Sequence, residues 1–269
     1  LLFTPAADVY GSPYAWCTFR VQDDGGTANG GVDLDPVAKT MTVNVTPVND
    51  APAGTSTAVT TLEDTAYVFT ATDFGFTDPN DSPADNFLAV EITSLPNAGS
   101  LTYNGAAAIA GQSISLADLA AGKLLFTSAA DVYGSPYAWF AFRVQDDGGT
   151  AHGGVDLDPV AKTMTVNVTA VNDAPAGTSA TVTTLEDTAY AFTATDFGFT
   201  DPNDSPADNF LAVEITSLPN AGSLTYNGAA ATAGQSISLA DLAAGRLLFT
   251  PAADVYGSSY AWFSFRVQD

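Results

Sequence analysis

Aspartate and asparagine dominate the loop-like segments of this chain, and their oxygens are the side-chain groups best suited to chemistry. Asp-Asp pairs precede glycine at 23–25 and 146–148, and Asp-Pro-Asn-Asp occurs at 78–81 and again at 201–204. Calcium prefers about six to eight oxygen ligands, mostly carboxylates and carbonyls. The same residue types also form turns through local hydrogen bonds. The pattern therefore favours cation binding in the loops, with plain turn formation as the alternative.

The charge balance argues against several classes of function. The chain has 30 acidic and 7 basic residues, for a formal charge of −23. Nucleic acids and anionic membrane surfaces both require a cationic face, so we expect neither as a partner. No apolar run is long enough to predict membrane insertion by this segment. With one histidine, His152, and no nucleotide-binding or nucleophile motif, we expect no enzyme.

A tandem repeat with a period of 123 residues sets the domain organisation. Residues 1–146 match residues 124–269 at about nine positions in ten. A period of this length suits one domain per repeat rather than a solenoid unit. Proline in Val-Asn-Asp-Ala-Pro, at 48–52 and 171–175, predicts a connector at each of those places. We expect a complete repeat at 47–169, the C-terminal part of a preceding repeat at 1–46, and the truncated N-terminal part of a following repeat at 170–269.

Alternation of polar and apolar residues predicts β-strands throughout the repeat. At 137–144, for example, Phe140, Phe142 and Val144 share one face. One helical turn is expected at 117–122, where a glycine would end it. The other expected strands are 56–61, 65–72, 87–93, 100–103, 113–116, 123–127, 162–169 and 179–184. Short strands of period two without a long amphipathic helix are typical of an all-β chain built as an antiparallel β-sandwich.

Six short motifs recur in a familiar order around the connector. They are Asn-Asp-Ala-Pro at 49–52, Leu-Glu-Asp-Thr at 62–65, Phe-Thr-Asp-Pro-Asn-Asp at 76–81, Gly-Lys-Leu-Leu-Phe-Thr at 122–127, Phe-Arg-Val-Gln-Asp-Asp-Gly-Gly at 142–149 and Met-Thr-Val-Asn-Val-Thr at 164–169. Their combination resembles the cadherin-like (VCBS-like) tandem repeats of giant bacterial extracellular adhesins of the RTX type. The resemblance covers the whole chain. It implies tandem immunoglobulin-like or cadherin-like sandwiches, an extracellular or cell-surface location, and calcium (Ca²⁺) at the repeat junctions.

The resemblance also implies a ligand set for each connector. Carried over by position, the first set is Asp23, Asp24, Asn49, Asp50, Asp78, Asn80 and Asp81. The second set is Asp146, Asp147, Asn172, Asp173, Asp201, Asn203 and Asp204. Glu63 is expected to reach the second connector along the first strand of its repeat, and Glu186 is its copy.

These expectations lead to a structural function with two alternatives. The main hypothesis is the extender or stalk region of a giant adhesin, in which calcium stiffens the repeats and gives reach for cell adhesion or biofilm formation. Its partners would be the neighbouring repeats of the same chain. The first alternative is a segment of an extracellular filament, in which residues 24–46 of one copy supply a strand to another. The second is a carbohydrate- or partner-binding module that uses the exposed face around Trp139.

Overall fold

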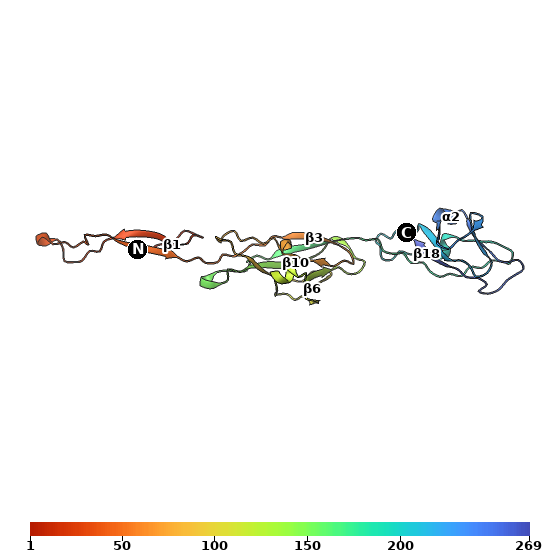
Figure 1. The fold of residues 1–269 in the computed structure, drawn as a ribbon, viewed down its shortest axis with the longest axis horizontal. Helices are drawn as coiled ribbons and strands as arrows, with labels where there is room; N and C mark the ends of the chain where they lie inside the picture. Colours follow the sequence, from red (N-terminus) through yellow and green to blue (C-terminus); the bar gives the residue numbers. More distant parts are fainter. The chain divides into compact units, whose positions relative to one another are not determined.

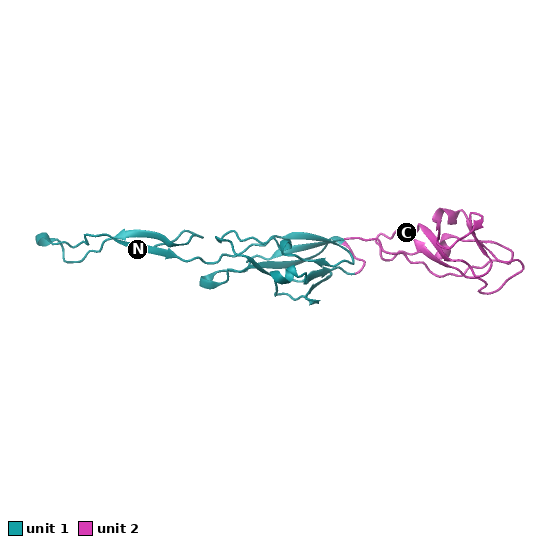
Figure 2. Cartoon of the chain, in the orientation of Figure 1, with its two compact units in different colours: residues 1–129, 134–168 teal, residues 130–133, 169–269 magenta.

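The computed structural model describes all 269 residues and divides them into two compact units (Figure 2). The first unit contains residues 1–129 and 134–168, and the second contains residues 130–133 and 169–269. The main boundary thus falls beside the end of the repeat expected at 47–169, and residues 1–46 belong to the first unit. Antiparallel strands make up most of both units, so the chain is all-β.

Residues 1–46 form a two-stranded antiparallel sheet (Figure 1). It pairs β1 (Gly11–Phe19) with β2 (Lys39–Val45), and a short 3-10 turn (Ala28–Gly30) lies in the loop between them. Cys17 of β1 is opposite Met41 of β2, and both side chains are exposed. The apolar side chains of this two-stranded sheet are therefore not covered by a second layer.

The rest of the first unit contains two antiparallel sheets and one short helix. The five-stranded sheet has the order β3 (Thr57–Leu62), β11 (Lys162–Thr169), β10 (Gly134–Asp146), β5 (Phe87–Ile92), β8 (Gln112–Ser115). The four-stranded sheet has the order β4 (Tyr67–Val68), β9 (Leu124–Thr127), β6 (Ser100–Tyr103), β7 (Ala106–Ala107). Helix α1 (Leu116–Ala120) and two 3-10 turns (Ala71–Phe74 and Ala151–Gly153) complete it.

A single hydrophobic core joins these two sheets. Phe140 and Phe142 of β10 are fully buried, and the ring of Phe140 packs edge-on against Phe69 at 5.5 Å between centroids. Phe126 of β9, in the other sheet, belongs to the same buried cluster. The alternation expected at 137–144 is therefore confirmed, because every second side chain of β10 enters this core while Trp139 stays exposed.

The second unit repeats most of this pattern. One sheet has the order β16 (Gln235–Ser238), β13 (Ala212–Ser217), β18 (Ser264–Gln268), and the other has β12 (Tyr190–Ala191), β17 (Leu247–Thr250), β14 (Ser223–Tyr226), β15 (Ala229–Ala230). Helix α2 (Leu239–Ala243) and a 3-10 turn (Ala194–Phe197) match their copies in the first unit. The unit has no strand equivalent to β3 or β11. Both α-helices have five residues, and neither is long and apolar enough to cross a membrane.

Two expected strands are corrected by the structure. The strand expected at 65–72 is limited to Tyr67–Val68, because the Asp73 carboxylate accepts a hydrogen bond from the Thr70 amide and starts a 3-10 turn. The strand expected at 179–184 does not form, whereas its counterpart β3 does. In the first unit β3 pairs only with β11, so the second unit offers this segment no partner for a ladder.

Candidate cation-binding site

Three segments distant in the sequence meet at one end of the strand pair β5–β10. Asp146, the last residue of β10, is opposite Phe87 at the start of β5. The loop that leads into β5 carries Asp78, and the backbone of Thr77 in that loop bridges to Ala53. Strand pairing thus brings the end of β10, the loop before β5 and the segment before β3 together.

Carboxylates from this loop form a tight cluster. Oxygens of Asp78, Asp81 and Asp85 all lie within 4.8 Å of one another. Asp146 lies close enough for the charges of Asp78 and Asp85 to raise its pKa. Its Oδ1 accepts hydrogen bonds from Asn49 Nδ2 at 3.1 Å and from the Gly148 amide at 3.0 Å. Since calcium binds oxygen at about 2.3–2.6 Å, two ligands on opposite sides of one ion lie roughly 5 Å apart. The cluster therefore has the dimensions of a calcium site.

Backbone amides hold one oxygen of each of two aspartates. The Asp85 amide donates to Asp78 Oδ2 at 2.5 Å, and the Asp50 amide donates to Asp81 Oδ2 at 2.9 Å. These bonds orient the carboxylates while each keeps a second oxygen for another partner.

Three oxygens at the site are buried and accept no hydrogen bond. They are Oδ1 of Asn49, Oδ1 of Asp78 and Oδ2 of Asp146. The exposed fraction of Asp78 is 8%, and that of Asp146 is 0%. A buried carboxylate oxygen without a partner is costly, because burial removes its hydration and nothing replaces it. A bound cation would supply the missing partner for all three.

Burial and neighbouring carboxylates raise the pKa of three carboxyls at the site. Burial raises the pKa of Asp146, partly offset by hydrogen bonds from Gly148 and Asn49, and the negative charges of Asp85 and Asp78 raise it further. Burial also raises the pKa of Asp81 and of Asp85, with repulsion from Asp78 adding to both. Each shift opposes ionisation, and a divalent cation would reverse it.

The second unit contains a copy of this site. Oxygens of Asp201, Asp204, Asp208 and Asp269 lie within 4.8 Å of one another. Asp201 Oδ1 and Asp269 Oδ2, the counterparts of the orphaned atoms of Asp78 and Asp146, again accept no hydrogen bond. The Asp173 amide donates to Asp204 at 3.0 Å and lowers the pKa of that carboxyl, but burial together with Asp201 and Asp208 raises the pKa by more. An equivalent backbone amide therefore orients Asp81 in the first unit and Asp204 in the second.

The structure regroups the residues expected to bind the metal. Asp146 lies with Asn49 and Asp78, whereas it was expected at the other connector. The reason is that β10 is antiparallel to β5, so its end returns to the start of its own repeat. Asp147 instead accepts two hydrogen bonds from Asn86, which lower its pKa.

Several other expected ligands lie outside the two clusters. Asn80, Asn203, Asp23, Asp24, Asn172 and Glu186 are exposed, and Glu63 is buried. Asp50 and Asp173 contribute backbone amides to their clusters. Sequence reasoning missed Asp85 and its copy Asp208, although each follows the Asp-Pro-Asn-Asp motif in the same loop. Both residues lie in a loop, where no helical or strand periodicity predicts which way a side chain points.

The donor set fits a hard cation, because it consists of carboxylate and amide oxygens alone. No family model, curated protein or solved structure matches this chain. The resemblance to cadherin-like adhesin repeats therefore stays a prediction.

Proposed function

We propose that this chain is part of the structural stalk of an extracellular adhesin, built from immunoglobulin-like or cadherin-like sandwich repeats that calcium stabilises. The observation that carries the proposal is the set of buried oxygens without hydrogen bonds at Asn49, Asp78 and Asp146, repeated at Asp201 and Asp269. A fold that groups several carboxylates and leaves a buried oxygen of Asp78 and one of Asp146 without a hydrogen bond is best explained by a cation there.

The tandem repeat supports the stalk role. Near-identical domains give length, and each added repeat brings another copy of the same acidic cluster. Extracellular modules bind calcium with dissociation constants of about 10⁻⁴–10⁻³ M, so such sites fill outside cells and stay largely empty inside them. At a hundredfold excess over its dissociation constant, one calcium ion adds about 2.7 kcal/mol to the free energy of unfolding.

Thermal unfolding of the whole chain in calcium and in chelator tests this proposal. We expect calcium to raise the melting temperature by roughly ten degrees, because about 1 kcal/mol shifts a domain of this size by several degrees. Asp146→Asn should remove the gain from the first unit, and Asp269→Asn should remove that from the second.

Asp23→Asn is the matched control. Asp23 holds the same place in the repeat as Asp146, but it is exposed and belongs to neither cluster. Its substitution should leave the calcium effect unchanged. An equal melting temperature in calcium and chelator would exclude calcium stabilisation. Equal effects of Asp146→Asn and Asp23→Asn would exclude this particular site.

A further inference from the structure

A two-residue turn in the first unit combines asparagine with glycine. Asn104 and Gly105 connect β6 to β7, and Tyr103 pairs with Ala106 on either side of them. Both turn residues have positive φ angles, 53° for Asn104 and 78° for Gly105, as a type I′ hairpin turn requires. Both are exposed. The turn therefore presents an asparagine side chain and the backbone amide that follows it to water.

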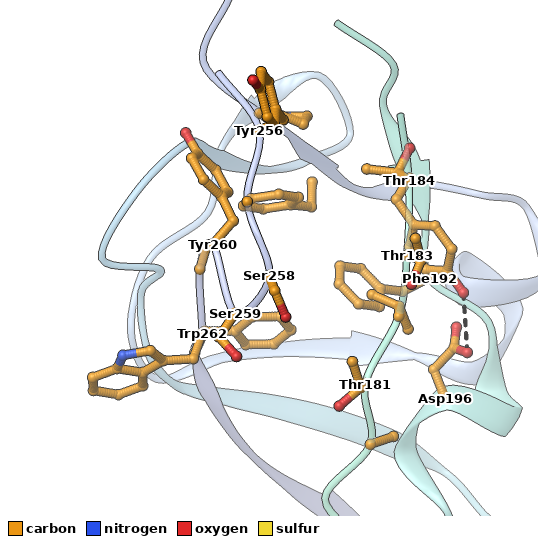
Figure 3. A pocket seen from close by; sticks show the side chains of 18 of the residues that line it. Thr181, Thr183, Thr184, Phe192, Asp196, Tyr256, Ser258, Ser259, Tyr260 and Trp262 are labelled. Carbon is orange, nitrogen blue, oxygen red and sulfur yellow. Dashed lines mark hydrogen bonds between the residues drawn. The ribbon is translucent and has the colours of Figure 1, made fainter. Parts of the chain in front are cut away.

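The second unit contains the same turn. Asn227 and Gly228 connect β14 to β15, with φ angles of 54° and 78°. This unit also contains a cavity that is lined mainly by residues 180–186 and 255–263, part of which Figure 3 shows. Neither Asn227 nor Gly228 lines that cavity, so the chemistry of the turn does not depend on what fills it.

The side chain of Asn104 is free, in contrast to those of other asparagines in the same unit. No hydrogen bond holds its carboxamide. By comparison, Asn97 Oδ1 accepts a hydrogen bond from the Trp139 amide at 2.8 Å, and Asn86 Nδ2 donates to the Asp147 carboxylate at 3.1 Å. Such bonds fix the orientation of a carboxamide, whereas that of Asn104 can rotate toward the next backbone nitrogen.

We propose that Asn104 and Asn227 are sites of spontaneous deamidation. In the first unit the Gly105 nitrogen gives its proton to hydroxide and bonds to Cγ of Asn104. The Cγ–Nδ2 bond breaks, and the leaving nitrogen takes a proton from water, so that ammonia departs, hydroxide is restored and a succinimide ring remains. Water then opens the ring at either carbonyl and gives aspartate or isoaspartate. Glycine favours the attack because no Cβ atom shields its nitrogen and its backbone rotates most freely.

The place of the turn in the sheet favours the reaction and defines its effect. Ring closure requires rotation of the main chain at Asn104, so the hairpin must open locally. Strand β7 has two residues and lies at the edge of its sheet, where opening costs much less than unfolding the domain. Isoaspartate lengthens the main chain by one carbon atom, so the product no longer fits a two-residue turn, and the pairing of Tyr103 with Ala106 is lost.

Ageing of the whole chain in heavy-oxygen water at mildly alkaline pH, followed by mass-spectrometric peptide mapping, tests the proposal. We expect label and isoaspartate to accumulate at Asn104 and Asn227 at least tenfold faster than at Asn97. The exposed pair Asn29-Gly30 should react as well. Asn104→Gln should abolish the signal at that position and leave the signal at Asn227 unchanged, because glutamine forms its larger ring far more slowly. Absence of label at both Asn104 and Asn227 would overturn the proposal.

Ala98→Gly separates the effect of structure from that of the following glycine. It gives Asn97 a glycine neighbour while the Trp139 amide still holds the Asn97 side chain. We expect this position to stay slow in the folded chain and to react as fast as Asn104 in denaturing urea. Equal rates at Asn97 and Asn104 in the folded variant would contradict the role assigned to the free side chain. The reaction requires no calcium, so its outcome is independent of the stalk proposal.

Discussion

At the scale of single residues, Gly148 lies close to two oxygens of the candidate cation site. A Cβ atom at this position would be 1.9 Å from Asn49 Oδ1 and 2.4 Å from Asp85 Oδ2. Both atoms are ends of side chains, so they could move away without disturbing the strands. Their displacement would nevertheless spoil a ligand set that depends on short oxygen–metal distances.

Gly148→Ala should therefore weaken calcium binding by at least tenfold, which corresponds to about 1.4 kcal/mol, while the fold survives. Calorimetric titration of the metal-free chain with calcium measures the affinity. Gly25→Ala is the control at the same place in the repeat, where a Cβ atom would meet only the side chain of Asp23, at 3.2 Å. Unchanged affinity in Gly148→Ala would contradict the proposed position of the ion.

At the scale of an element, helix α1 is held by one carboxylate. The Asp118 amide donates to the hydroxyl of Ser115, which caps the helix, and the Asp118 carboxylate accepts hydrogen bonds from Lys123 and Tyr103, each at 2.6 Å. Hydrogen bonds from Lys123, Tyr103 and Ser115 lower the pKa of Asp118 to about 2. In α2 the same network recurs with Arg246 in place of Lys123.

The lowered pKa predicts a defined loss of stability in acid. As the pH falls, the unfolded Asp118 carboxyl binds its proton near 3.8, before the folded one does near 2. The contribution of Asp118 is thus complete above pH 3.8 and is lost as the pH falls toward about 2. Urea midpoints of the wild type and of a double variant that combines Asp118→Asn with Asp241→Asn should converge over this range. The urea midpoint of the control variant Asp8→Asn, at an exposed position, should change with pH as that of the wild type does. A constant separation between the wild type and the double variant would contradict the role of the network.

At the scale of the whole molecule, a charge of −23 opposes compact folding through self-repulsion. Sodium chloride screens such repulsion between exposed charges, but it hardly reaches buried carboxylates such as Asp78 and Asp146. Screening and specific cation binding are therefore separable.

We expect sodium chloride to raise the melting temperature of the metal-free chain gradually, and calcium to raise it much further at equal ionic strength. Magnesium serves as a comparison, since it demands a stricter octahedral geometry than calcium. If sodium chloride at equal ionic strength reproduced the calcium gain, the acidic residues would act by general repulsion alone.

Local patterns explain which features were predictable from sequence. The inward face of β10 was predictable because alternation along a strand depends only on near neighbours, and the helical turn at α1 because glycine follows it. The grouping of Asp146 with Asn49 was not, because their contact spans 97 positions and depends on which strands pair. The same holds for segment 179–184, whose sequence favours a strand that does not form in the second unit.

The sequence alone determined the repeat, its period, the all-β class and the abundance of oxygen ligands in loops. These properties follow from composition and from short-range periodicity. The tertiary structure decided which carboxylates share a site and which of their oxygens lack hydrogen bonds. Those properties arise when antiparallel pairing brings the end of one strand to the start of another, and no local pattern encodes that meeting.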